Sequence, residues 1–117
     1  MTINAGVWID HDKAVVVLLT SDGSEVLHIP SHDDRERLRG GRQMRTQVII
    51  RLNAYYDDVI NCVREAQAIV ILGPGETKSE FRRRISSLKL RGHIAEMTTV
   101  AKLTDQQIVD YVRQHFQ

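Results

Sequence analysis

The sequence has few of the residues that build several common kinds of site. Its 117 residues include one cysteine and two prolines, and aromatic residues make up only 5%. The single cysteine, Cys62, excludes a disulfide framework and any zinc site made of several cysteines. No apolar run approaches the ~18 residues that cross a membrane, and the N-terminus lacks a basic-then-apolar export signal. We therefore expect a reduced, cytoplasmic, soluble protein that makes no membrane contact.

The length and composition are those of one globular domain. Apolar residues make up 42% of the chain and charged residues 26%, values that exclude disordered and fibrous proteins. A chain of this length can bury one core without metal or disulfide support. Residues 1–117 are therefore predicted to form a single domain.

The small net charge of +1 hides an uneven distribution of basic residues. The windows 35–51 and 76–91 together carry 12 of the 16 lysines and arginines. Acidic residues lie mostly outside these two windows. This asymmetry predicts a basic face, whose usual partner is a polyanion.

Apolar periodicity predicts strands first and helices later. Short apolar runs at residues 4–10, 14–19 and 25–29 are separated by polar turns and predict three strands. Further apolar runs predict strands at 68–72 and 93–98. Between them, apolar residues at three- and four-residue steps predict an amphipathic helix from about Thr46 to Glu65; they are Val48, Leu52, Tyr55, Val59 and Val63.

Two T-x-x-E/Q patterns predict the starts of the last two helices. Thr77 and Glu80 would form a capping box that opens a helix through about Leu88, which we place on its inner side. Thr104 and Gln107 would open a C-terminal helix in the same way. The resulting order, β-β-β-α-β-α-β-α, predicts an α/β domain with a mixed sheet and helices on its faces, which is the order of the ribonuclease H-like fold.

Because that fold includes nucleases, converging carboxylates would indicate nuclease chemistry. A two-metal nuclease needs several of them at the ends of neighbouring strands. Asp10 ends the first strand, but the fourth strand ends in residues 72–74, which contain none. Asp57 and Asp58 fall away from the apolar stripe of the helix, and the five histidines lack the spacing of metal ligands. We predict no nuclease chemistry, no metal site and no cofactor.

The polar stretch from residue 31 to about residue 45 is predicted to be a flexible basic loop. Its centre reads Arg-Gly-Gly-Arg-Gln-Met-Arg, from residue 39 to residue 45. The glycines allow close backbone approach, and the arginines can bind phosphates in a bidentate way. Contact with RNA is therefore predicted from Arg39, Gly40, Gly41, Arg42 and Arg45.

A second basic segment follows the fourth strand. Residues 73–78 read Gly-Pro-Gly-Glu-Thr-Lys, which departs from a P-loop because no glycine directly precedes the lysine. A strand, a glycine turn and a helix N-terminus can nevertheless hold an anion such as a nucleic-acid phosphate. A tight turn with a helix cap explains the same residues. As a second RNA-binding patch we predict Lys78, Arg82 and Arg83.

Taken together, these segments resemble one protein family. A three-strand start, a basic Gly-Gly loop, a long helix and a strand ending in Gly-Pro-Gly-x-Thr-Lys look like the central domain of archaeal and eukaryotic class-1 peptide-chain release factors and their relative Pelota. The chain is more similar still to stand-alone bacterial members of that superfamily, sometimes labelled translational machinery proteins. The best-matched pieces are residues 8–11, 40–41 and 73–81, and the similarity runs from about Ala5 to Val100.

The resemblance implies a role in translation, with the ribosome or tRNA as partner. In release factors the equivalent loop carries Gly-Gly-Gln, which helps water hydrolyse the peptidyl-tRNA ester. Here Arg42 separates the glycines from Gln43, so a peptidyl-tRNA hydrolase with Gln43 as the catalytic residue is an alternative to plain RNA docking. A protein-interaction module whose arginines meet an acidic partner is a third hypothesis. The sequence leaves the oligomeric state open.

Overall fold

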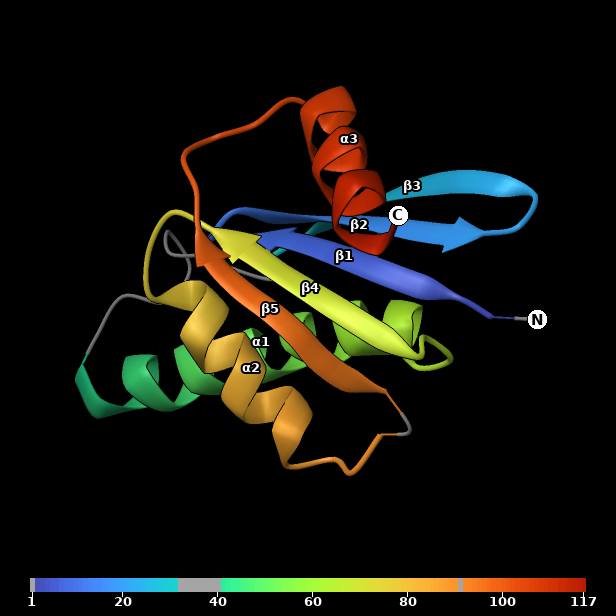
Figure 1. Cartoon of the computed structure of the whole chain (residues 1–117). Coiled ribbons are helices and arrows are strands. Elements are labelled where there is room, and N and C mark those ends of the chain that lie inside the picture. Colours follow the sequence, from blue (N-terminus) through green and yellow to red (C-terminus); the bar gives the residue numbers. More distant parts are fainter. Residues whose placement is uncertain (1, 32–40, 91) are drawn as a thin grey trace.

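The protein is described by a computed structural model that covers residues 2–31, 41–90 and 92–117, and for residues 41–48 it describes the backbone only. The predicted order of elements is confirmed (Figure 1). The strands are β1 (Asn4–Ile9), β2 (Lys13–Thr20), β3 (Gly23–Pro30), β4 (Ala68–Gly73) and β5 (His93–Thr99). The helices are α1 (Gly41–Val63), α2 (Thr77–Ser86) and α3 (Asp105–Phe116).

The strands form one five-stranded mixed sheet in the order β3-β2-β1-β4-β5. β1 pairs antiparallel with β2, which pairs antiparallel with β3, while β4 lies parallel to both β1 and β5. The β1–β2 turn is fixed by Asp10, whose Oδ1 accepts hydrogen bonds from the backbone N–H groups of Asp12 (2.8 Å) and Lys13 (2.9 Å). The mixed α/β sheet expected from the sequence is therefore present.

Helices cover both faces of the sheet and create two apolar clusters. In Figure 1, α1 and α2 lie on one face and α3 lies on the other. Alternate β1 side chains enter different clusters: Val7 and Ile9 pack towards α1 and α2, whereas Trp8 packs with α3. At Gly6 the strand approaches α3 so closely that a Cβ atom would clash with Val112. Both faces of β1 are buried, which explains its uninterrupted apolar sequence.

Helix α1 is longer at its N-terminal end than the sequence predicts. We expected a loop up to about Arg45 and a helix from Thr46, but α1 begins at Gly41. The stretch from Gly41 to Arg45 is thus helical backbone, and that part of the predicted loop is wrong. Arginine, glutamine and methionine all favour helix, so local propensity agrees with the structure even though the segment lacks an apolar stripe. Residues 32–40, the rest of the predicted loop, lie outside the described residues.

The two predicted capping boxes have different outcomes. At α3, Thr104 and Gln107 form both reciprocal hydrogen bonds, which confirms that prediction. At α2 the N-cap is Glu76 and no side chain caps the helix, so the predicted box at Thr77 is wrong. The same helix ends at Ser86, which leaves Leu88 beyond its C-terminus and 41% exposed instead of on the inner side.

Candidate nucleic-acid interface

The first residues of α1 and α2 lie at the same edge of the sheet. This is the edge where the parallel strands β1, β4 and β5 end, the usual place for functional sites in sheets of this kind (Figure 1). The Tyr55 hydroxyl of α1 donates to the backbone oxygen of Asp10, directly after β1 (2.9 Å). The 14 residues of α1 before Tyr55 span roughly 20 Å of helix at 1.5 Å per residue. Leu52 still packs against the core, and the first turns of α1 extend past the strand ends (Figure 1). Arg42 and Arg45 belong to this projecting part.

A hydrogen bond from Lys78 stabilises the Gly-Pro-Gly turn at residues 73–75. The Lys78 Nζ donates to the Gly75 backbone oxygen (2.6 Å), and the side chain is only 8% exposed. On the other side of the turn, a Cβ atom at Gly73 would clash with the backbone oxygen of Ile9. Both contacts fit the tight-turn interpretation of this segment. Lys78 thus differs from Arg82 and Arg83, which are exposed on α2.

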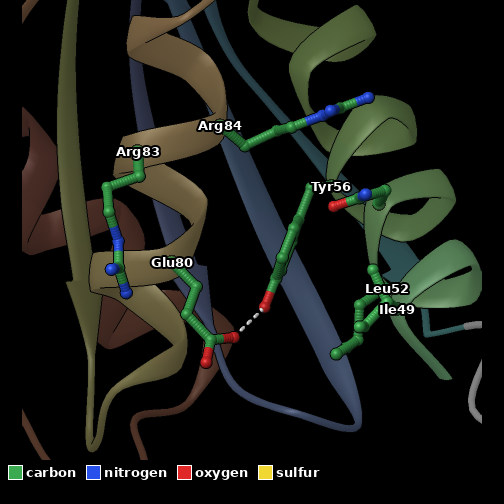
Figure 2. A pocket seen from close by; sticks show the side chains of 7 residues that line it. Ile49, Leu52, Tyr56, Glu80, Arg83 and Arg84 are labelled. Carbon is green, nitrogen blue, oxygen red and sulfur yellow. Dashed lines mark hydrogen bonds between the residues drawn. The ribbon is translucent and has the colours of Figure 1, made fainter. Parts of the chain in front are cut away.

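A groove of about 380 Å³ separates α1 from α2. Figure 2 shows the side chains that line it: Ile49, Leu52, Asn53 and Tyr56 from α1, and Glu80, Arg83 and Arg84 from α2. The Tyr56 hydroxyl donates to Glu80 Oε2 (2.6 Å). Burial, together with this carboxylate, raises the pKa of the Tyr56 phenol above its ordinary value. The phenol is therefore a fixed hydrogen-bond donor at the floor of the groove.

A second contact between the helices lies one residue further along α1 and four residues further along α2. Arg84 donates to both oxygens of Asp57, from Nε to Oδ1 and from Nη2 to Oδ2, each at 2.9 Å. This bidentate hydrogen bond lowers the pKa of the Asp57 carboxyl below its ordinary value. Both side chains are partly exposed, so the pair adds orientation more than stability. Together the Tyr56–Glu80 and Asp57–Arg84 contacts fix α2 against α1.

These contacts were not found from the sequence. The sequence pattern places Asp57 away from the apolar stripe of its helix and Glu80 in a capping box. The partners are separated by 24 and 27 residues, so no local spacing indicates them. One feature of the predicted order could have indicated them. α1 precedes β4 and α2 follows it, so the two helices can pack side by side and bring polar residues of α1 opposite those of α2.

The predicted RNA-binding residues differ in their position in the fold and in their exposure to solvent. Arg39 and Gly40 lie outside the described residues. The backbones of Gly41, Arg42, Gln43 and Arg45 lie in the first turns of α1. Arg82 and Arg83 are exposed on α2, whereas Lys78 is mostly buried. Of these residues, the described ones of α1 belong to its first turns at the edge of the sheet, whereas Arg82 and Arg83 lie in the second half of α2 and Lys78 supports the turn before α2.

The carboxylates considered for a nuclease do not come together. Asp10 is engaged in the β1–β2 turn, and Asp57 is engaged by Arg84. Within residues 2–31, 41–90 and 92–117, no group of three or more metal-binding side chains occurs. Cys62 is partly buried beside the core, and burial followed by Asp58 and Glu25 raises the pKa of its thiol. In the same part of the chain, no helix is long and apolar enough to cross a membrane.

The fold resembles one part of the solved structures of a translation termination factor and of proteins related to it in structure. By sequence, the chain matches no protein-family model and no curated protein. By structure, it resembles the archaeal translation termination factor aRF1, with a TM-score of 0.63 and 19% identity over 94% of this chain. It also resembles Thermoplasma acidophilum Pelota, with a TM-score of 0.62 and 21% identity over 92% of this chain.

A third similar structure is Dom34 of S. cerevisiae, described as a translation termination-like factor involved in RNA quality control pathways. Its TM-score is 0.59, with 15% identity over 95% of this chain. The chain spans about a third of the length of these proteins: 33% of aRF1, 30% of the Thermoplasma Pelota and 32% of Dom34. The expected likeness to the release factor and Pelota fold is thereby confirmed.

Proposed function

We propose that this protein is a cytoplasmic, translation-associated domain that binds RNA on the ribosome or tRNA through a basic surface. The observation that supports the proposal is the concentration of basic residues on two neighbouring helices, α1 and α2, the first of which begins at the edge where the parallel strands end. The projecting start of α1 contains Arg42 and Arg45, and the nearby helix α2 exposes Arg82 and Arg83. The fold shared with aRF1 and Pelota gives this surface a context in translation.

Charge is concentrated on the two helices of this face. α1 and α2 together contain seven basic and three acidic residues, whereas the whole chain has 16 basic and 15 acidic residues. The remainder of the chain is therefore net acidic. On the opposite face, α3 carries two acidic residues and one basic residue, so a polyanion would be attracted more strongly to the face of α1 and α2.

Within this surface we assign different tasks to the basic residues. Arginines fit phosphate better than lysines, because the planar guanidinium forms two parallel hydrogen bonds. Arg39, Arg42 and Arg45, with Gly40 and Gly41, would contact the RNA backbone near the start of α1. Arg82 and Arg83 would form the second contact. Lys78 would support these contacts indirectly, because its hydrogen bond stabilises the turn that precedes α2.

Co-sedimentation of the purified protein with bacterial ribosomes over a salt series tests the proposal. Because each neutralised phosphate releases counterions, the logarithm of the affinity should fall linearly with the logarithm of the salt concentration. Charge reversal at Arg39, Arg42 and Arg45 should abolish pelleting and leave the melting temperature unchanged.

The matched control is Arg113→Glu, which reverses an exposed arginine on α3, across the sheet from α1 and α2. This variant should pellet like the unmodified protein. Equal pelleting of the triple variant and the unmodified protein would overturn the proposed surface. Absence of pelleting at low salt would overturn the role on the ribosome.

A further inference from the structure

Exposed aliphatic side chains mark a second surface on α1. Among the residues whose side chains the structure describes, the large apolar residues that are strongly exposed are Ile49 (58%), Ile50 (55%) and Leu88 (41%). Two of these three are neighbours on the part of α1 that projects past the strands. Isolated exposed apolar residues are common, but adjacent ones beside a groove indicate a contact surface.

The groove between α1 and α2 continues this apolar surface inward. Ile49, Leu52 and Tyr56 line it from α1 at steps of three and four residues, so they form one row along the helix. Tyr56 is 3% exposed and forms the floor of the groove, whereas Ile49 stands open at its outer end. A row of this length matches the apolar anchors of an amphipathic helix at positions i, i+3 or i+4, and i+7.

The charge preference of the groove comes from the helices that form it. Its lining contains one acidic residue, Glu80, whose carboxylate accepts from the Tyr56 hydroxyl, and two basic residues, Arg84, which is paired with Asp57, and the exposed Arg83. The two helices are net basic, as described above. An occupant with carboxylates beside its apolar row would therefore be attracted, whereas one with lysines or arginines would be repelled.

We propose that the α1–α2 groove binds an amphipathic helical segment of a partner protein, with an apolar row flanked by acidic residues. RNA fits this surface poorly, because aliphatic side chains offer nothing to phosphates and Tyr56 is too buried to stack on a base. A second copy of the chain fits poorly as well, because a twofold contact would place each basic face against its equivalent. The proposal does not depend on the RNA-binding surface.

Fluorescence anisotropy with a synthetic labelled peptide tests the groove. The probe is a short helix with leucines at i, i+3, i+4 and i+7 and glutamates on both sides of that row. It should bind the full chain, and an isomer with lysines in place of the glutamates should not. Ile49→Ser removes the open end of the row and should weaken binding by about tenfold or more. Arg83→Glu should weaken binding of the glutamate peptide but not of an uncharged serine version.

Ile50→Ser is the matched control, because Ile50 has nearly the same exposure but does not line the groove. It should change affinity by less than about twofold. Equal losses from the Ile49 and Ile50 variants, or no binding of the glutamate peptide, would overturn the proposal. Concentration-dependent dimerisation that Ile49→Ser abolishes would assign the face to a second copy instead. Ribosome pelleting lost in Ile49→Ser but retained in Ile50→Ser would assign it to the ribosome.

Discussion

Lys78 offers the sharpest test of how the basic residues divide between structure and binding. Its stem is buried and its ammonium donates to the Gly75 backbone oxygen at 2.6 Å. Lys78→Met keeps a stem of similar length and removes the charged hydrogen bond, which contributes about 1.5–3 kcal/mol. Ordering and desolvating the lysine offset part of that contribution. We therefore expect the free energy of unfolding to fall by about 1–2 kcal/mol.

Urea denaturation and thermal unfolding would measure this change. At this chain length, 1 kcal/mol corresponds to roughly 4 °C in Tm. Arg82→Met is the matched control: it is exposed four residues later on the same helix and should change stability by less than about 0.5 kcal/mol. In ribosome co-sedimentation, Lys78→Met should keep the salt dependence of the unmodified protein. Unchanged stability combined with a shallower salt dependence would refute the structural role and make Lys78 a phosphate contact.

Three further predictions concern the scaffold. Burial and the nearby Asp10 carboxylate raise the pKa of Tyr55, so its phenol ionises in the unfolded chain near pH 10 but not in the folded one. Stability should thus fall as the pH rises above about 10, and less steeply in Tyr55→Phe, as measured by urea midpoints against pH. Thr104→Ala should cost about 1 kcal/mol and Thr104→Ser much less; equal losses would argue against the capping box. Gly6→Ala should cost about 1–3 kcal/mol by overpacking, and Val112→Ala in the same chain should recover part of that loss.

Strand positions could be predicted from the sequence because burial and periodicity act locally. The interior residues of β1, β2 and β4 are almost all apolar, since both sheet faces are covered, and a polar turn separates β1 from β2. The α3 start was equally visible, because Thr104 and Gln107 satisfy each other within four residues. In these places, the partners that stabilise the structure are neighbours in the sequence.

The features that sequence reasoning missed depend on tertiary contacts. Glu80 has the spacing of a capping residue, but Tyr56 of α1 offers it a hydrogen bond across the helix pair. The sequence predicts Lys78 as an RNA contact beside Arg82 and Arg83, because nothing local indicates that the Gly75 carbonyl accepts from its ammonium. The α1–α2 groove was missed for the same reason. It exists only when residues of α1 come to lie opposite residues of α2.

The position of Gln43 bears on whether the protein hydrolyses peptidyl-tRNA or only binds the ribosome or tRNA. The resemblance to release factors implies a Gly-Gly-Gln loop that reaches the reacting ester, and one inserted arginine already shifts the glutamine by about 3.5 Å. Here Gly41 and Gln43 belong to the first turn of α1, where the backbone rises by only 1.5 Å per residue. A helical backbone spans less distance per residue than an extended loop, so the hydrolase alternative would require Gln43 to reach the ester from a helix. If Gln43→Ala lowers binding no more than the control Gln47→Ala and no ester hydrolysis is detected with peptidyl-tRNA, the docking function stands.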